Sequence, residues 1–330
     1  MEEEEMSDQI KGNVVNVVYL EGALAEIEVR KGNEKKSQAP YVSIKGAIQF
    51  GQSKAQMVRF EKYQAAYRVK DGVRRDYPAY DKLLEFAESA VSLASAKEGQ
   101  EVTKVRITGS YKDAPYVGRD GQLKQATKIE ASFFNDFKGN TEAIADVEGY
   151  VNSVVRETKA VDGEAEETGR LKVTIITFDF FKNAIPVTFI VEENLSEAFE
   201  DNISTGQTIT ALLEYKLNEK VAPTPVREGG IGVQRASEST TRSYLELVLT
   251  GTRGAALDPE DDGALSTEAV KAAMNEREQR LNKLVEEGYK GSASTSTNRS
   301  GIGGVQSKPV QQTQQEQTFV KDDDDDDVLF

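Results

Sequence analysis

The chain contains two similar stretches, and this duplication most constrains its fold. The stretch IKGNVVNVVYLEG begins at Ile10, and the stretch VEGYVNSVVRETK begins at Val147. Aligning Gly12 with Gly149 brings β-branched and alternating apolar residues to matching positions, which is a strand pattern. The stretches lie a whole domain apart, so we expect a duplicated domain rather than a solenoid of short repeats.

Both halves repeat one order of predicted elements. In the first half, strands are predicted over residues 10–22, 23–30, 41–50, 101–111 and 127–134, with a helix over 78–96. In the second half, strands are predicted over residues 150–157, 170–180, 185–191, 206–217 and 243–251, with a helix over 194–202. Five strands with a helix between the third and the fourth are the order of the OB-fold. Another small β-barrel or a sandwich is the alternative.

The remaining segments differ in character. Residues 265–290 predict one amphipathic helix that packs on the barrels or on a second subunit. Residues 291–318 are rich in Ser, Thr, Gly and Gln, which is typical of a flexible linker. We therefore expect a mainly β (α+β) chain. Its expected parts are an acidic arm (1–9), OB-like domains (10–138 and 146–254), a helix (264–290), a linker (291–321) and a disordered acidic tail (322–330).

The chain lacks Cys, His and Trp, which excludes several kinds of chemistry. Disulfides, zinc–thiolate sites, thiol nucleophiles and Ser-His-Asp triads cannot form. A carboxylate enzyme such as a magnesium-dependent nuclease stays open, but no spacing suggests three or four converging carboxylates. We expect a non-enzymatic protein without a cofactor or a metal.

The sequence also bears on location. No stretch reaches the roughly 18 consecutive apolar residues of a membrane helix. The first residues, MEEEEMSD, are acidic where a signal peptide is basic and apolar. We expect a cytoplasmic protein without membrane partners.

The net charge of −15 is unevenly distributed. Residues 9–145 carry 22 Lys and Arg against 17 Asp and Glu, whereas residues 146–254 carry 11 against 18. One basic segment thus lies within an acidic chain, and such asymmetry along a chain is informative about partners.

The basic segment interleaves cations with rings over residues 54–80. Single-stranded nucleic acid is bound by this combination, because cations track phosphates and aromatic faces stack on bases. The alternative is that the rings fill the barrel and the cations are a solvated surface. The candidate residues here are Arg59, Phe60, Lys62, Tyr63, Tyr67, Arg68, Lys70, Arg74, Arg75 and Tyr77.

Two predicted loops add to this candidate site, since the corresponding loops flank the oligonucleotide groove of OB-folds. They contribute Lys31, Lys35, Lys36, Lys112, Tyr116, Arg119 and Lys124. In the second half, the corresponding first loop at 157–168 is acidic and would repel phosphate. The long last loop at 219–242 carries Arg227, Arg235 and Arg242, so the second half is expected to bind weakly or to serve in assembly.

The chain ends in an acidic block with an apolar tip: Asp322, Asp323, Asp324, Asp325, Asp326, Asp327, Val328, Leu329 and Phe330. With the tandem OB-like halves and the linker, this tail resembles that of bacterial single-stranded DNA-binding proteins and their counterparts in tailed phages. The proline before the final Phe in bacterial tips is missing, as are the Trp residues that often stack on bases. These departures favour a phage relative.

The resemblance implies a function for the tail. Its tip would dock on replication, recombination or repair enzymes, such as a polymerase, helicase, primase or nuclease, in the infected bacterial cell. A linker of this length spans roughly 30 Å, so the aspartates would also reach the basic groove and compete with DNA.

Two functions from different classes follow. The first is a single-stranded DNA-binding protein that coats and protects the strand and recruits partners through its tail; a homo-oligomer is compatible with this hypothesis. The alternative is a phage interaction protein whose acidic surface mimics DNA and occupies a host DNA-binding enzyme.

Overall fold

The computed structural model describes residues 14–294 except 71, 119, 162–163 and 222–240. Its strands are β1 (Asn16–Asn33), β2 (Pro40–Gln49), β3 (Met57–Ala65), β4 (Tyr67–Lys70), β5 (Val73–Asp76), β6 (Lys104–Asp113), β7 (Tyr116–Val117), β8 (Leu123–Lys124), β9 (Thr127–Asp136), β10 (Glu142–Val161), β11 (Glu164–Phe178), β12 (Ala184–Val191), β13 (Thr208–Val221) and β14 (Thr241–Thr252). Its helices are α2 (Ala79–Ser89), α3 (Glu193–Asn202) and α4 (Thr267–Ser294).

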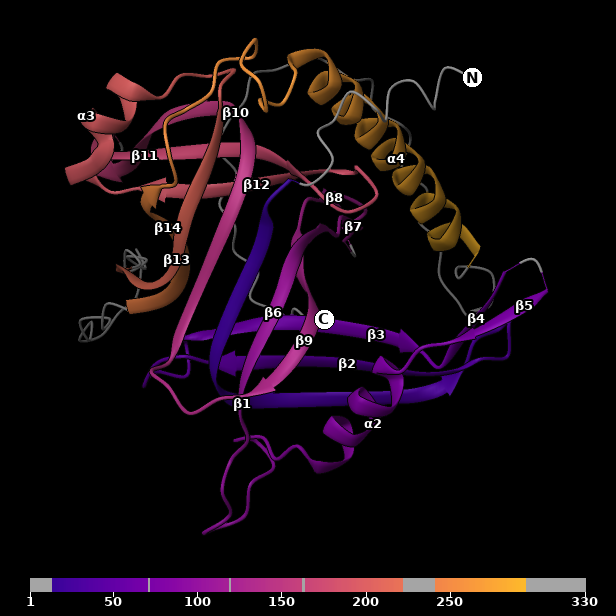
Figure 1. The fold of residues 1–330 in the computed structure, drawn as a ribbon. Coiled ribbons are helices and arrows are strands. Elements are labelled where there is room, and N and C mark those ends of the chain that lie inside the picture. Colours follow the sequence, from indigo (N-terminus) through magenta and orange to yellow (C-terminus); the bar gives the residue numbers. More distant parts are fainter. Residues whose placement is uncertain (1–13, 71, 119, 162–163, 222–240, 295–330) are drawn as a thin grey trace, which may run out of the picture. The chain divides into compact units, whose positions relative to one another are not determined.

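The first barrel consists of β1, β2, β3, β9 and β6, and it closes because β1 pairs with both β2 and β6 (Figure 1). β3 runs parallel to β9 at Glu61 and Glu130, while the other pairs are antiparallel. α2 lies between the third and fourth barrel strands along the chain. This is the strand order of the OB-fold, so the predicted fold class is confirmed.

The second barrel repeats this order with β10, β11, β12, β14 and β13. Its parallel contact joins Ile190 of β12 to Val248 of β14, and α3 occupies the place of α2. The two barrels share one continuous sheet, because β1 pairs antiparallel with β10 from Asn16↔Val147 to Glu21↔Glu142.

Gly22 is where β1 changes partner. Up to Ala23 the strand pairs with β6, and from Ala23 onward it pairs with β2. A Cβ at Gly22 would lie 2.2 Å from the carbonyl oxygen of Gln49, so a glycine is needed for this close approach. A bulge between Leu24 and Glu26 follows and helps to bend the strand around the barrel.

The second barrel changes partner in the same way. β10 passes from β13 to β11 at Tyr150, and a bulge follows between Val151 and Ser153. Gly22 therefore corresponds to Gly149, each preceded by a buried glutamate. The duplication is real, but our alignment of Gly12 with Gly149 is wrong.

The strand assignment of the first half needs a related correction. From Asn16 onward, the two predicted strands at 10–22 and 23–30 form one bent strand, β1, because the chain bends at Gly22 but does not reverse its direction. The strand that the prediction omits is β3, which lies inside the segment 54–80 that we interpreted as a binding segment.

The helix predicted over residues 78–96 is too long. α2 ends at Ser89, and the chain then runs along the bulge of β1. There the amides of Leu93 and Ala94 donate to the carbonyls of Leu24 and Ala25 at 2.8 and 3.0 Å. These bonds satisfy carbonyls that the bulge frees from the ladder, which explains why the helix does not continue.

α4 packs on the second barrel through its apolar stripe. Ala269, Val270 and Ala273 join Phe178 and Ile176 of β11 in a small buried cluster. Farther along, the Arg277 guanidinium donates to both carboxylate oxygens of Asp113, at the end of β6, at 2.9 Å. The C-terminal helix thus contacts both barrels and runs a few residues beyond its predicted end.

A buried tyrosine and a partly buried one connect the barrels. The hydroxyls of Tyr111 on β6 and Tyr215 on β13 lie 2.9 Å apart. Burial raises the pKa of Tyr215 to about 12. Burial, reinforced by Tyr215, also raises the pKa of Tyr111 well above its usual range.

The substitution Gly22→Ala tests the partner exchange. The new Cβ meets backbone, which cannot move aside cheaply, so we expect a loss of roughly 1–3 kcal/mol in the free energy of unfolding. Urea unfolding measures this loss. The control is Gly251→Ala, because nothing lies within 4 Å of the Cβ built there. Equal stabilities of the two variants would contradict the role of Gly22.

The tyrosine pair predicts a loss of stability in alkali. A group whose pKa is higher in the folded state stabilises the fold fully below its unfolded pKa of about 10. That stability is lost as the pH rises toward about 12, the pKa of folded Tyr215. We expect the unfolding free energy to fall between these values, and to fall less in the double variant Tyr111→Phe/Tyr215→Phe. Identical pH profiles would show that the pair does not titrate with folding.

Candidate nucleic-acid interface

The outer surface of the first barrel forms a ladder of opposite charges across β1, β2, β3 and β9. Strand register places Glu26, Ala47 and Arg59 side by side, and in the next row Glu28, Lys45 and Glu61. The ion pairs are Arg59–Glu26 at 3.5 Å, Lys45–Glu61 at 3.3 Å and Lys128–Glu61 at 2.8 Å. A phosphate on this surface must therefore compete with carboxylates.

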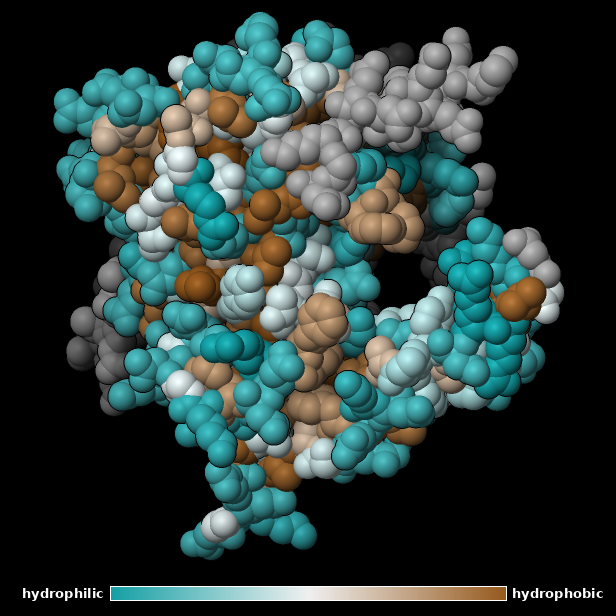
Figure 2. Space-filling view, in the orientation of Figure 1, coloured by the Kyte–Doolittle hydropathy of each residue, from teal (hydrophilic) through white to brown (hydrophobic). Residues whose placement is uncertain are grey.

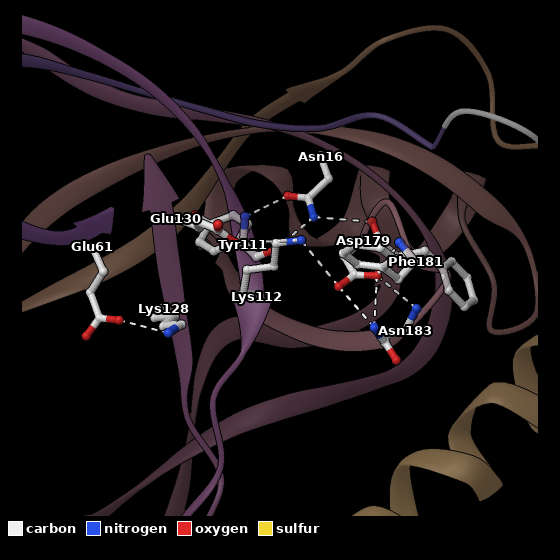
Figure 3. A network of polar contacts seen from close by, with 10 residues as sticks. Asn16, Glu61, Tyr111, Lys112, Lys128, Glu130, Asp179, Phe181 and Asn183 are labelled. Atoms are coloured by element: carbon white, nitrogen blue, oxygen red, sulfur yellow. Dashed lines mark hydrogen bonds and ion pairs between the residues drawn. The ribbon is translucent and has the colours of Figure 1, made fainter. Parts of the chain in front are cut away.

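Lys112 extends the ladder to the second barrel. Its ammonium lies 3.8 Å from Glu130 of β9 and 3.3 Å from Asp179, directly after β11 (Figure 3). The neighbouring cation Lys62 is half-buried, which lowers its pKa, although Glu130 opposes this effect.

Two stacked rings lie beside the ladder. Tyr41 and Tyr63 occupy adjacent strands, with centroids 5.2 Å apart and planes inclined by 31°. The Tyr63 hydroxyl donates to Glu34 at 2.7 Å, which ties the ring to the loop between β1 and β2. Partial burial and the bond to Glu34 raise the pKa of Tyr63 to about 12. The ring is 47% exposed, so it is available for stacking.

β4 and β5 form a hairpin directly after β3, which we call the arm. Register places Arg68 opposite Arg75 and Lys70 opposite Val73, so three cations share one face. Arg68, Lys70 and Arg75 make no ion pair within the described part of the chain. Like charges opposite each other destabilise a hairpin, and a polyanion would relieve this repulsion. Figure 2 shows the arm as hydrophilic, with a small apolar patch near its end.

The other face of the arm is internally paired. Arg74 lies 4.0 Å above the Tyr67 ring and 2.7 Å from Asp76. Tyr77 follows the arm and is 37% exposed.

The two candidate loops lie in the expected connections. Lys35 and Lys36 are exposed in the turn between β1 and β2. Between β6 and β9, Tyr116 of β7 faces Lys124 of β8 and is 43% exposed. Lys124 pairs with Asp120 at 3.7 Å, and Arg119 lies outside the described residues.

Phe60 requires a correction, because its ring fills the core of the first barrel. It is 1% exposed and packs against Phe134, with the two ring centroids 5.7 Å apart. It cannot stack on a base in this structure, so its prediction as a nucleic-acid-binding residue is wrong. Lys31 is engaged as well, in an ion pair with Glu88 of α2 at 2.6 Å.

Several residues of this candidate surface were not predicted from the sequence. Lys45, Lys128 and Tyr41 reach it through strand register, and period-two alternation around β2 and β9 could have indicated them. Phe133 is 66% exposed next to the inward-packed Phe134, and the bulge in β9 lies just before them, at Ser132. Phe180 and Phe181, after β11, are exposed at 86% and 76%.

The same surface of the second barrel is acidic. In the first barrel, three register positions are held by Arg30, Tyr63 and Lys128. The equivalent positions of the second barrel are held by glutamates, which surround Arg170. These glutamates are Glu157, Glu192 and Glu246. They hold the pKa of Arg170 above its usual value despite the opposing effect of burial.

Some predictions fall on residues that the structure does not describe. These are the acidic N-terminal segment at 1–9, most of the linker, Arg227, Arg235 and the tail at 322–330. Within the described ranges, no helix is long and apolar enough to cross a membrane. The same residues contain no group of three or more carboxylates placed to hold a metal ion.

Comparison with known proteins gives remote structural likenesses and one family. No curated protein sequence matches the chain. The single-stranded DNA-binding protein of Thermus aquaticus superposes with a TM-score of 0.41 at 10% identity, over 76% of this chain and 98% of that one. The mitochondrial single-stranded DNA-binding protein Rim1 of S. cerevisiae gives a TM-score of 0.23 at 11% identity, over 38% and 97% of the chains. The model of the YorF family matches residues 14–287, and the chain therefore belongs to the YorF family.

Proposed function

We propose that the chain is a non-enzymatic single-stranded DNA-binding protein that binds the strand along the first barrel. The observation that carries the proposal is the arm, where Arg68, Lys70 and Arg75 share one face without carboxylate partners in the described chain. The arm follows β3, whose Tyr63 ring stacks on Tyr41. Cations beside exposed rings suit a single strand, because its bases are free to stack.

The wider role follows the resemblance of the tail. The protein would coat and protect the strand during phage replication, recombination or repair in the cytoplasm of the infected bacterium. The tail, residues 322–330, would recruit replication or recombination enzymes by placing Phe330 in an apolar pocket with a basic rim.

The acidic surface of the second barrel favours one other function. Glu157, Glu192 and Glu246 share the single cation Arg170, so this face could engage a basic DNA-binding protein as a DNA mimic. That function requires no affinity for nucleic acid, and the following titration separates the two.

Titration with labelled oligo-dT, oligo-rU and duplex DNA at several salt concentrations tests the proposal. We expect salt-sensitive binding to single strands and little binding to duplex. The double variant Arg68→Ser/Arg75→Ser removes two phosphate contacts, so the logarithmic salt slope should fall by about 0.7 per contact. Its thermal stability should not fall, because the substitution removes a repulsion.

The control Lys97→Ser/Lys104→Ser removes the same charge from exposed positions outside the interface. It should leave the salt slope near that of the wild type. Equal slopes for the two double variants would place the DNA elsewhere, and no binding of the wild type to oligo-dT would refute the proposal.

Deletion of residues 322–330 tests the tail. If the aspartates compete for the basic surface, the shortened chain should bind oligo-dT more tightly at low salt. The gain should vanish at high salt. The control chain keeps its length, with Asp322 to Asp327 changed to Asn, and should show the same gain. A loss of affinity on deletion would contradict competition by the tail.

A further inference from the structure

The turn between β11 and β12 exposes two phenylalanines. Phe180 and Phe181 are 86% and 76% exposed, the highest values among the large apolar side chains described. Their rings meet edge to face, with centroids 5.4 Å apart and planes at 85°. Leaving two phenyl rings in water forgoes roughly 1.5–3 kcal/mol of burial energy for each. A well-ordered turn that does this suggests a binding role.

The turn itself is firmly structured by Asp179. The Asp179 carboxylate accepts hydrogen bonds from the amides of Phe181 and Asn183 at 2.9 and 3.0 Å. It also accepts from the Asn183 side chain at 3.2 Å. Although burial opposes ionisation, these bonds and Lys112 hold the pKa of Asp179 below its usual value. The rings are therefore presented by a fixed backbone.

Contacts from two other parts of the fold hold the turn in place. Asn16 of β1 donates to the carbonyl of Phe178 at 3.3 Å, and Lys112 of β6 pairs with Asp179 at 3.3 Å. From the other side, Arg280 of α4 donates to Asn183 at 2.7 Å. Figure 3 shows the contacts of Asn16, Lys112 and Asp179, with Phe181 pointing away from them.

The first barrel has no such pair of rings. Its equivalent turn, between β2 and β3, contains Phe50, which packs partly buried against the core. The exposed phenylalanines are thus not a requirement of the barrel, since the duplicated fold forms without them.

Although it belongs to the second barrel, the turn continues the charged surface of the first. The Lys112 ammonium lies 5.9 Å from the centre of the Phe181 ring and also pairs with Glu130 on the ladder. Phe180, Lys112 and Lys182 border a shallow hollow of about 200 Å³. Rings beside cations are the combination that binds a single strand.

We infer that Phe180 and Phe181 form a base-stacking tip that receives the single strand as it leaves the first barrel past Lys112. The inference rests on the proposed function and extends it to the second barrel, whose own outer surface is acidic. A base fits better than an apolar peptide. The rings stand perpendicular and offer separate faces rather than a groove, and the adjoining cations suit phosphate.

Tryptophan reporters test this inference directly, because the chain has no Trp. In Phe181→Trp, oligo-dT should quench the fluorescence in step with binding, which is measured independently by the anisotropy of a labelled oligo. The control is Val155→Trp on β10, which is 57% exposed away from the tip and should not be quenched. Binding of the oligo without quenching of Phe181→Trp would overturn the inference while leaving the proposed function intact.

A length series gives a second test that does not depend on a probe. The variant Phe180→Ser/Phe181→Ser should bind an oligo-dT of about 30 nucleotides roughly tenfold or more weakly, since a stacked base contributes about 1–3 kcal/mol. An oligo of about 8 nucleotides, which the first barrel alone can occupy, should show a smaller loss. Equal affinities of variant and wild type at both lengths would refute the base-stacking tip. Quenching of Phe181→Trp on addition of unlabelled wild-type protein in the absence of DNA would also refute it, because the rings would then contact a second copy of the chain.

Discussion

The pairing of β1 with β10 is the contact on which the rest of the structure depends. It joins two closed barrels into one sheet and thereby fixes how the duplicated halves face each other. Because each first strand must also turn from one barrel partner to the next, both carry a glycine and a bulge near the shared edge. The same pairing brings the β11–β12 turn against Lys112. Phe180 and Phe181, which belong to this turn, therefore lie beside the first barrel.

The two halves keep one backbone plan and differ in the surface that it carries. Equivalent register positions hold Arg30, Tyr63 and Lys128 in the first barrel, but glutamates in the second. Strand pairing and bulges depend on inward residues and glycines, so outward positions were free to change charge without loss of the fold. The contrast explains a basic segment within a chain of net charge −15.

The sequence predicts the second barrel better than the first, for a physical reason. Strand β12 is a nearly continuous apolar run, whereas β3 alternates Val58 and Phe60 with Arg59, Glu61 and Tyr63. That alternation is a strand pattern with Phe60 facing inward, yet it also resembles the interleaved cations and rings of a binding segment. Ion pairs such as Lys112–Asp179 join residues far apart in the sequence, so no local pattern could have indicated them.

The distribution of ion pairs bears on how salt would act on DNA binding. Cations of the ladder, such as Lys128, already neutralise carboxylates. A phosphate that replaces such a carboxylate releases its own counterion, but the freed carboxylate takes up a cation from solution, so the net release is small. The cations of the arm have no such partners in the described chain, and their contacts should release counterions from the strand. The salt slope should therefore report mainly on the arm and fall short of the number of cations along the path. Stacking on Tyr63 adds affinity that salt hardly changes, because burying a ring against a base releases no ions.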